Sequence, residues 1–209
     1  PILYDKNWVQ KKIENQLLKD FKINFSLSSD ISYRILPSPH YLIKDSKILK
    51  EDDKTVSLAE IKILKVFISQ KNFFDKKKVS VRFVNINNAD FLLSKNNLKL
   101  LKNNRHNKFS NKKIKINKSN IFFNNNFDEI VFIIRLSEAS LFQDDKNLLN
   151  LFKLKGEVFN IPFRFDYNKN FDSSKNEEFN IIAKKLKLNI FNKLSSSENN
   201  NIMGENIIS

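Results

Sequence analysis

The sequence predicts a mainly β protein with one N-terminal amphipathic helix, and three observations lead to this fold class. Apolar residues near the N-terminus recur every three to four positions, whereas from residue 23 onward they alternate with polar ones. Phenylalanine occurs 20 times in 209 residues, which is ample material for a core. Glycine occurs only twice, so Asn, Asp and Ser must form most turns. We expect long antiparallel strands in a curled sheet, which either leaves an open groove or closes like a β-sandwich.

Residues 8–21 are the predicted helix, with Asn7 as a plausible N-cap. One face of this helix is apolar and carries Val9, Ile13, Leu17 and Phe21, with Leu18 alongside. We assign residues 1–22 to this helical segment, residues 23–194 to the β domain and residues 195–209 to a polar flexible tail. No stretch reaches the roughly 18 apolar residues that a membrane span needs. Because the chain opens with Pro1, we expect a membrane anchor upstream of that residue.

The first predicted strand covers residues 23–35 and ends at two prolines, Pro37 and Pro39. Residues 146–152 could form a helix, and residues 96–107 could form another short one. Within the strands around residues 61–68 and 81–86 the apolar phase flips, which indicates bulges or bends in long strands. The further strand candidates are residues 56–69, 79–93, 113–123, 129–142, 159–167 and 186–190.

A short pattern recurs four times within these strands. It consists of an apolar residue, two variable residues, a small residue, one more variable residue and two apolar residues. The small residues are Ser46, Ala89, Ser119 and Ala139. The spacing of the copies is irregular, so we expect strands repeated on one sheet rather than a solenoid of fixed period.

The residues that carry catalysis or bind metals are scarce. Cysteine is absent, and the two glycines stand alone, so phosphate-cradling loops are not expected. The two histidines, His40 and His106, lack nearby partners for a metal site or a general base. The adjacent carboxylates, such as Asp52 and Asp53, fit solvated turns. We therefore expect a protein that is not an enzyme and has no cofactor and no metal.

The net charge of +14 raises the alternative of nucleic-acid binding. However, Lys, Asn, Ile and Phe all have A/T-rich codons, so a low-G+C genome would raise their numbers without any ligand. Only five arginines occur, and they are scattered singly, whereas readout of bases and phosphates favours arginine. Nucleic acid is therefore the less favoured partner.

The N-terminal region resembles the AsmA family of Gram-negative envelope proteins. The matching features are the helix, the strand residues Asp30-Ile31-Ser32, the bend Leu36-Pro37-Ser38-Pro39 and the strand that returns through Ile48. The proline-centred bend is the most specific of them, so Leu36, Pro37 and Pro39 form the structural motif. Where the family often has a glycine between helix and strand, this chain has Asp20, Phe21 and Lys22.

This resemblance implies a periplasmic domain, anchored in the inner membrane, that takes part in outer-membrane biogenesis. Its larger relatives are similar to bridge-like lipid-transfer proteins, so the implied partners are phospholipids or other acyl-chain ligands and envelope proteins. The residues that would line a lipid groove form the apolar face of the first strand: Phe25, Leu27, Ile31, Tyr33 and Ile35. The alternative is that this face belongs to a closed core, and the protein is then a periplasmic structural adaptor.

Overall fold

The computed structural model describes residues 6–50, 53–69, 79–94, 108–125, 129–170, 176–196 and 202–208. In these residues one α-helix, α1 (Lys6–Phe21), is followed by twelve strands and a short 3-10 turn, η3 (Lys184–Leu186). The strands are β1 (Asn24–Ser26), β2 (Ile31–Arg34), β3 (His40–Leu49), β4 (Ser57–Ile68), β5 (Val81–Ser94), β6 (Lys113–Asn124), β7 (Ile130–Asp144), β8 (Leu149–Val158), β9 (Ile161–Asn170), β10 (Glu177–Ala183), β11 (Leu188–Ser196) and β12 (Ile202–Ile208).

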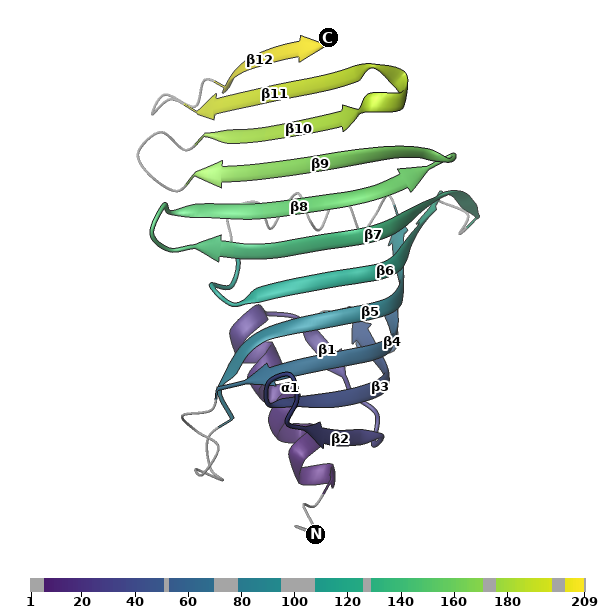
Figure 1. Cartoon of the computed structure of the whole chain (residues 1–209), viewed down its shortest axis with the longest axis vertical. Helices are drawn as coiled ribbons and strands as arrows, with labels where there is room; N and C mark the ends of the chain where they lie inside the picture. Colours follow the sequence, from purple (N-terminus) through teal and green to yellow (C-terminus); the bar gives the residue numbers. More distant parts are fainter. Residues whose placement is uncertain are drawn as a thin grey trace.

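All twelve strands belong to one sheet, which confirms the predicted fold class. From β3 to β12, neighbouring strands follow the order of the chain. β1 pairs with the edge of β3 that β4 does not occupy, and β2 also pairs with β3. Every pairing is antiparallel except that of β5 with β6, which is parallel. The sheet does not close on itself, and it twists from the N-terminal strands at one end to β12 at the other (Figure 1).

Helix α1 lies across the first strands and buries its apolar face there (Figure 1). The four predicted core positions of the helix are all buried, and Ile13 and Leu17 are completely inaccessible. Leu18 is instead exposed, because it points away from the strands. Together with residues of β1 to β6 these side chains form one continuous core. We call the side of the sheet on which α1 lies the inner face.

Two side chains of α1 also satisfy backbone groups that the sheet leaves unpaired. Leu27 follows β1 and lies outside any strand. Its N–H donates to Glu14 Oε1 at 2.7 Å, and its carbonyl accepts from Gln10 Nε2 at 2.6 Å. Because buried backbone groups are costly to leave unbonded, these two bonds fix the chain where it leaves β1.

A line of interrupted pairing crosses strands β3 to β7. Asp45, Asn88 and Lys118 have left-handed backbone conformations, with φ of 51°, 53° and 47°. Each is skipped in the ladder, and pairing resumes at the residue that follows it or the one after. The next residue along each strand is buried and small: Ser46, Ala89 and Ser119. The recurring sequence pattern therefore marks the places where this line crosses β3, β5 and β6. In β4 the same interruption of pairing accounts for the phase flip near Ile61. The second flip coincides with a register shift, which skips Arg82.

Several details of the prediction differ from the structure, and strands β8, β10 and β12 lie in none of the predicted strand ranges. The first strand is divided into β1 and β2, and residues 146–152 form a turn and the start of β8 rather than a helix. The predicted polar tail, residues 195–209, contains the end of β11 and the whole of β12, because residues 202–208 pair with β11 from Ile190 to Ser196. The helix expected at residues 96–107 lies outside the described residues.

Candidate functional site

The five residues predicted to line a groove do not share one accessible surface. Phe25, Leu27 and Ile31 are buried in the core beneath α1. Tyr33 is half-buried, and its ring packs against that of Tyr41 with 5.5 Å between centroids. Ile35 is 65% exposed at the end of β2. The closed-core alternative therefore describes this part of the sheet, because the helix fills the space that a ligand would need.

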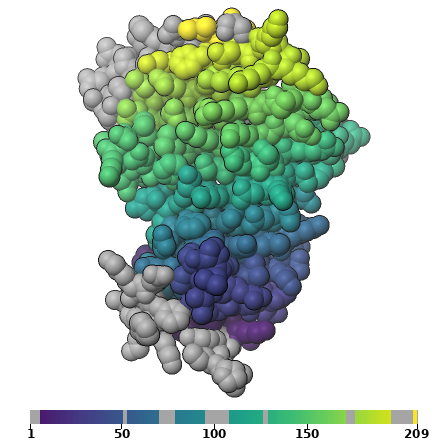
Figure 2. Space-filling model, in the orientation of Figure 1, coloured from purple at the N-terminus to yellow at the C-terminus, as the bar shows by residue number. Residues whose placement is uncertain are grey.

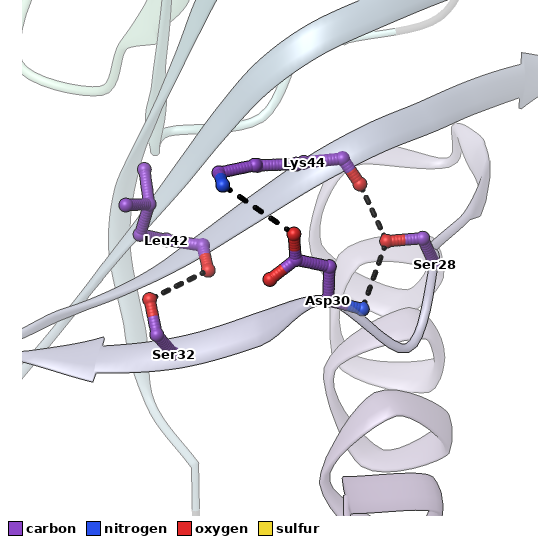
Figure 3. A network of polar contacts seen from close by, with 5 residues as sticks. All are labelled: Ser28, Asp30, Ser32, Leu42 and Lys44. Atoms are coloured by element: carbon purple, nitrogen blue, oxygen red, sulfur yellow. Dashed lines mark hydrogen bonds and ion pairs between the residues drawn. The ribbon is translucent and has the colours of Figure 1, made fainter.

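A turn pinned to β3 explains why the first predicted strand is divided (Figure 3). The Ser28 hydroxyl donates to the carbonyl of Lys44 at 2.5 Å and accepts from the Asp30 N–H at 3.1 Å. The Lys44 ammonium lies 3.5 Å from the Asp30 carboxylate, and Ser32 Oγ donates to the carbonyl of Leu42 at 3.5 Å. Short polar side chains that bond nearby backbone compete with strand pairing, so the serines and Asp30 favour a turn here.

The proline-centred bend connects β2 to β3. Leu36 and Pro37 are exposed at its tip, and the peptide bond between them is cis. Pro39 is buried, and its carbonyl accepts from the Ile68 N–H at 3.1 Å, which extends the pairing of β3 with β4. The three motif residues thus shape the hairpin between β2 and β3.

Strands β6 to β12 present a continuous apolar inner face. One row of register partners crosses all seven strands, and every member is apolar: Ile116, Ala139, Leu154, Phe165, Ile181, Ile190 and Ile208. The row begins at Ile116, which packs against the core beneath α1. In the part of the chain that the structure describes, no other helix or strand packs as a layer over β8 to β10. We call this surface the apolar face.

Side chains of the apolar face are less buried than those beneath α1. Phe152, Phe163 and Phe165 pack against a small core of Leu136, Ala139 and Leu154, but all three phenylalanines remain half-buried. Phe152 and Phe165 meet edge to face at 5.8 Å. Their remaining exposed area is apolar surface that a ligand with an acyl chain could cover.

The two ends of the strands differ in polarity on the inner face. Near the β7–β8 turn a row of register partners is polar: Gln143, Asn150, Lys169 and Glu177. The Lys169 ammonium lies 2.5 Å from the Glu177 carboxylate, and Asn150 Oδ1 accepts from the Phe109 N–H at 2.9 Å. Near the β8–β9 turn the row is instead apolar and contains Ile121, Ile134, Val158 and Ile161. The apolar face is therefore bounded by polar groups at one end only.

An open cavity of about 610 Å³ lies where α1 ends and the apolar face begins. Phe21 and Ile23 line it from the helix side, and Ile114 and Leu141 line it from the sheet. The Lys112 ammonium, 2.6 Å from the Asp20 carboxylate, joins the end of the helix to the start of β6. This cavity adjoins the uncovered strands, and its lining is about half apolar and half polar.

The opposite, outer face of the sheet carries a group of basic side chains. Figure 2 shows the molecule from the side on which α1 is almost hidden behind the strands. A cavity of about 370 Å³ on this face is lined by Lys113, Lys115, Lys153, Lys155 and Arg164. Several of these cations already have partners. Lys155 Nζ lies 2.6 Å from Glu138, whose pKa it lowers by hydrogen bonding and charge, and Arg164 pairs with Asp166 at 2.7 Å.

The described residues contain no group of three His, Asp or Glu side chains that could hold a metal ion. His40 is buried and stacks on Phe67, with 4.8 Å between the ring centroids. Phe67 in turn stacks on Phe83, with 4.2 Å between the ring centroids. Its Nδ1 lies 2.8 Å from the carbonyl of Ser38. His40 therefore packs the outer side of the first strands, whereas His106 lies outside the described residues.

No protein-family model matches the chain, and no curated protein matches it either. The described helices include none that is both long enough and apolar enough to cross a membrane.

The residues of the apolar face were within reach of sequence reasoning. Phe163 and Phe165 stand in a predicted strand with clear alternation. The information missing from the sequence was which alternating strands the helix covers.

Proposed function

We propose that this chain is a non-catalytic acyl-chain-binding domain that takes part in lipid transport. The apolar face of β6 to β12 binds the acyl chains of a phospholipid, and the cavity beside α1 extends that surface. The observation that carries this proposal is the all-apolar row from Ile116 to Ile208, which no other described layer covers. Apolar surface of this extent gains free energy by leaving water, at about 25 cal/mol per Å².

The resemblance of the N-terminal region to the AsmA family supports a cellular location for this activity. We propose a periplasmic domain, anchored in the inner membrane by a segment upstream of Pro1, that serves outer-membrane biogenesis. The closed core beneath α1 is then the rigid base of the domain. Nucleic-acid binding is less favoured, because two cations of the basic outer face, Lys155 and Arg164, already pair with Glu138 and Asp166.

Two neighbouring residues of β10 give a matched test. Ile181 belongs to the apolar row, whereas Ile182 pairs with Arg164 on the outer face, and both are half-buried. The experiment is crosslinking of a phospholipid with a photoreactive acyl chain, presented as monomers below its aggregation concentration. Ile181→Glu should reduce crosslinking strongly, because a carboxylate would lie beside the acyl chain. Ile182→Glu should leave it unchanged.

Circular dichroism of both variants checks that they remain folded. The proposal fails if the wild-type protein captures no lipid, or if the two substitutions reduce capture equally. Peptide mapping of the crosslink supplies a second criterion, because the labelled residues should lie on β7 to β11 rather than on the outer face.

A further inference from the structure

The ends of the strands near the β8–β9 turn carry exposed apolar side chains beside lysines. The connections β6–β7, β8–β9 and β10–β11 all turn at this end, on the right in Figure 1. Phe159 is 74% exposed at the β8–β9 turn, and Leu186 is 54% exposed in η3. Ile130 and Val131 at the start of β7 are also exposed. We call this set of turns the apolar tip.

Phe159 occupies a position that is unfavourable for a phenylalanine. β8 and β9 are joined by two residues, Phe159 and Asn160, with φ of 52° and 60°. Such a turn favours Asn, Asp or Gly at both positions, and a bulky residue with positive φ is an outlier. The backbone strain and the exposure of the ring are both unfavourable for the isolated protein. Strain of this kind clusters at functional sites, where it serves an interaction.

Three lysines surround the apolar tip on the β10–β11 side. Lys184, Lys185 and Lys187 are exposed on both sides of Leu186. Lys185 Nζ lies 3.5 Å from the carbonyl of Asn160, which brings η3 beside the β8–β9 turn. Among the described residues, no carboxylate forms an ion pair with any of these three lysines. Their charges are thus available to an anionic partner.

The opposite end of the same strands has a different character. The β7–β8 turn contains Asp144 and Asp145, and Asp144 accepts hydrogen bonds from Lys146 and Asn147. The inner face is polar at that end and apolar at the tip. A lipid could therefore reach the apolar face from the tip without passing the polar row that ends at Lys169 and Glu177.

We propose that the apolar tip docks on an anionic phospholipid bilayer. Phe159 and Leu186 enter the headgroup region, and the three lysines contact lipid phosphates, as in interfacial membrane binding. The charge of the lysines and the exposed apolar side chains between them together fit a bilayer better than a nucleic acid, which offers no apolar phase. This proposal rests on the proposed function, because it names the surface from which the apolar face would receive lipid.

The test is flotation of the whole chain with vesicles of phosphatidylcholine that contain phosphatidylglycerol as the anionic lipid, because an anionic surface attracts clustered lysines. The triple variant Lys184→Gln, Lys185→Gln, Lys187→Gln should bind roughly 100-fold more weakly, at about 1 kcal/mol per lysine. Its control is Lys54→Gln, Lys62→Gln, Lys146→Gln, which removes three exposed lysines elsewhere. Phe159→Ser with Leu186→Ser should also weaken binding, whereas Leu148→Ser, 43% exposed at the opposite end, should not.

Three outcomes would overturn the docking proposal. The first is equal vesicle binding by the tip variants and their controls, and the second is no binding by the wild-type protein. The third is a dimer in sedimentation velocity that Phe159→Ser and Leu186→Ser dissociate, since the tip would then contact a second copy of the chain. Capture of the monomeric photoreactive lipid needs no bilayer, so the tip variants should retain it and Ile181→Glu should lose it while still floating with vesicles. The two proposals can therefore fail separately.

Discussion

The two halves of the sheet carry the same alternation of apolar and polar residues but bury it to different extents. In the N-terminal half, α1 seals the inner face, and Ile43, Leu64 and Val84 are inaccessible to solvent. In the C-terminal half, equivalent positions such as Phe163 and Phe165 are only half-buried. Alternation of apolar and polar residues therefore defines which face of a strand is apolar, but it does not determine which element covers that face.

The length of α1 limits how much of the sheet it can seal. Its 16 residues span roughly 24 Å, at 1.5 Å per residue. The helix runs across the strands (Figure 1), and strands lie about 4.8 Å apart, so a helix of this length covers about five of them. The strands beyond β6 are therefore out of its reach.

The largest expected effect separates the two halves directly. Leu27→Glu should unfold the protein at room temperature, because it places a carboxylate in the sealed core, at a cost of several kcal/mol against a total stability of about 5–15 kcal/mol. Ile181→Glu in the uncovered half should leave it folded. Thermal unfolding monitored by circular dichroism measures both. Ile35→Glu, at an exposed site next to β2, is the control and should change little.

A second prediction concerns a closely packed contact within the uncovered half, between β8 and β7. A Cβ added at Gly156 would lie 2.6 Å from the carbonyl oxygen of Arg135 on the neighbouring strand β7. That atom belongs to the backbone and cannot move aside easily, so Gly156→Ala should destabilise the protein by about 1–3 kcal/mol. Urea denaturation measures the change. An unchanged urea midpoint would mean that β7 and β8 can move apart at this position without a loss of stability.

A third prediction concerns the strained turn of the uncovered half. Phe159→Asn should stabilise the protein by about 1 kcal/mol, because Asn tolerates the left-handed backbone better than Phe does. The same substitution should weaken vesicle binding if the apolar tip docks on a bilayer. Urea denaturation and flotation on the same sample measure the two effects, and a loss of stability would contradict the assignment of strain to this residue.

The smallest expected effect lies at the β7–β8 turn, at the polar end of the same strands. The side-chain hydrogen bond from Asn147 lowers the pKa of Asp144, with smaller contributions from the backbone N–H groups of Asn147 and Lys146. A lowered folded-state pKa stabilises the protein above the ordinary carboxyl value, and this contribution is lost as pH falls through the folded value. Asn147→Ala should therefore raise the pKa of Asp144 towards its ordinary value. Titration followed by NMR would show this, and an unchanged pKa would contradict it.

Sequence reasoning recovered most of the secondary structure and little of the site. Spacing alone placed Val9, Ile13, Leu17 and Phe21 on the buried face of α1, since the period of a helix is a local property. The division of the first strand depends on a hydrogen bond from Ser28 to Lys44, 16 residues away, which no local pattern reveals. The parallel pairing of β5 with β6 is equally non-local.

The candidate site was misplaced for the same reason. Phe25 and Leu27 alternate with polar residues just as Phe163 and Phe165 do. Only the tertiary packing of α1 distinguishes the first pair from the second, since it buries one and leaves the other partly exposed. The pattern of small residues at Ser46, Ala89 and Ser119 was visible in the sequence, but its link to left-handed residues on adjacent strands was not.

The sequential order of the strands gives the apolar face an adjustable size. From β6 to β12 each strand pairs with the one before it, so every added hairpin widens the sheet by about 10 Å without touching α1. Gaining or losing a hairpin would therefore change the reach of the domain in fixed steps while the sealed half kept its fold. In evolutionary terms, the number of hairpins sets the width of the apolar face, and the half covered by the helix stays constant.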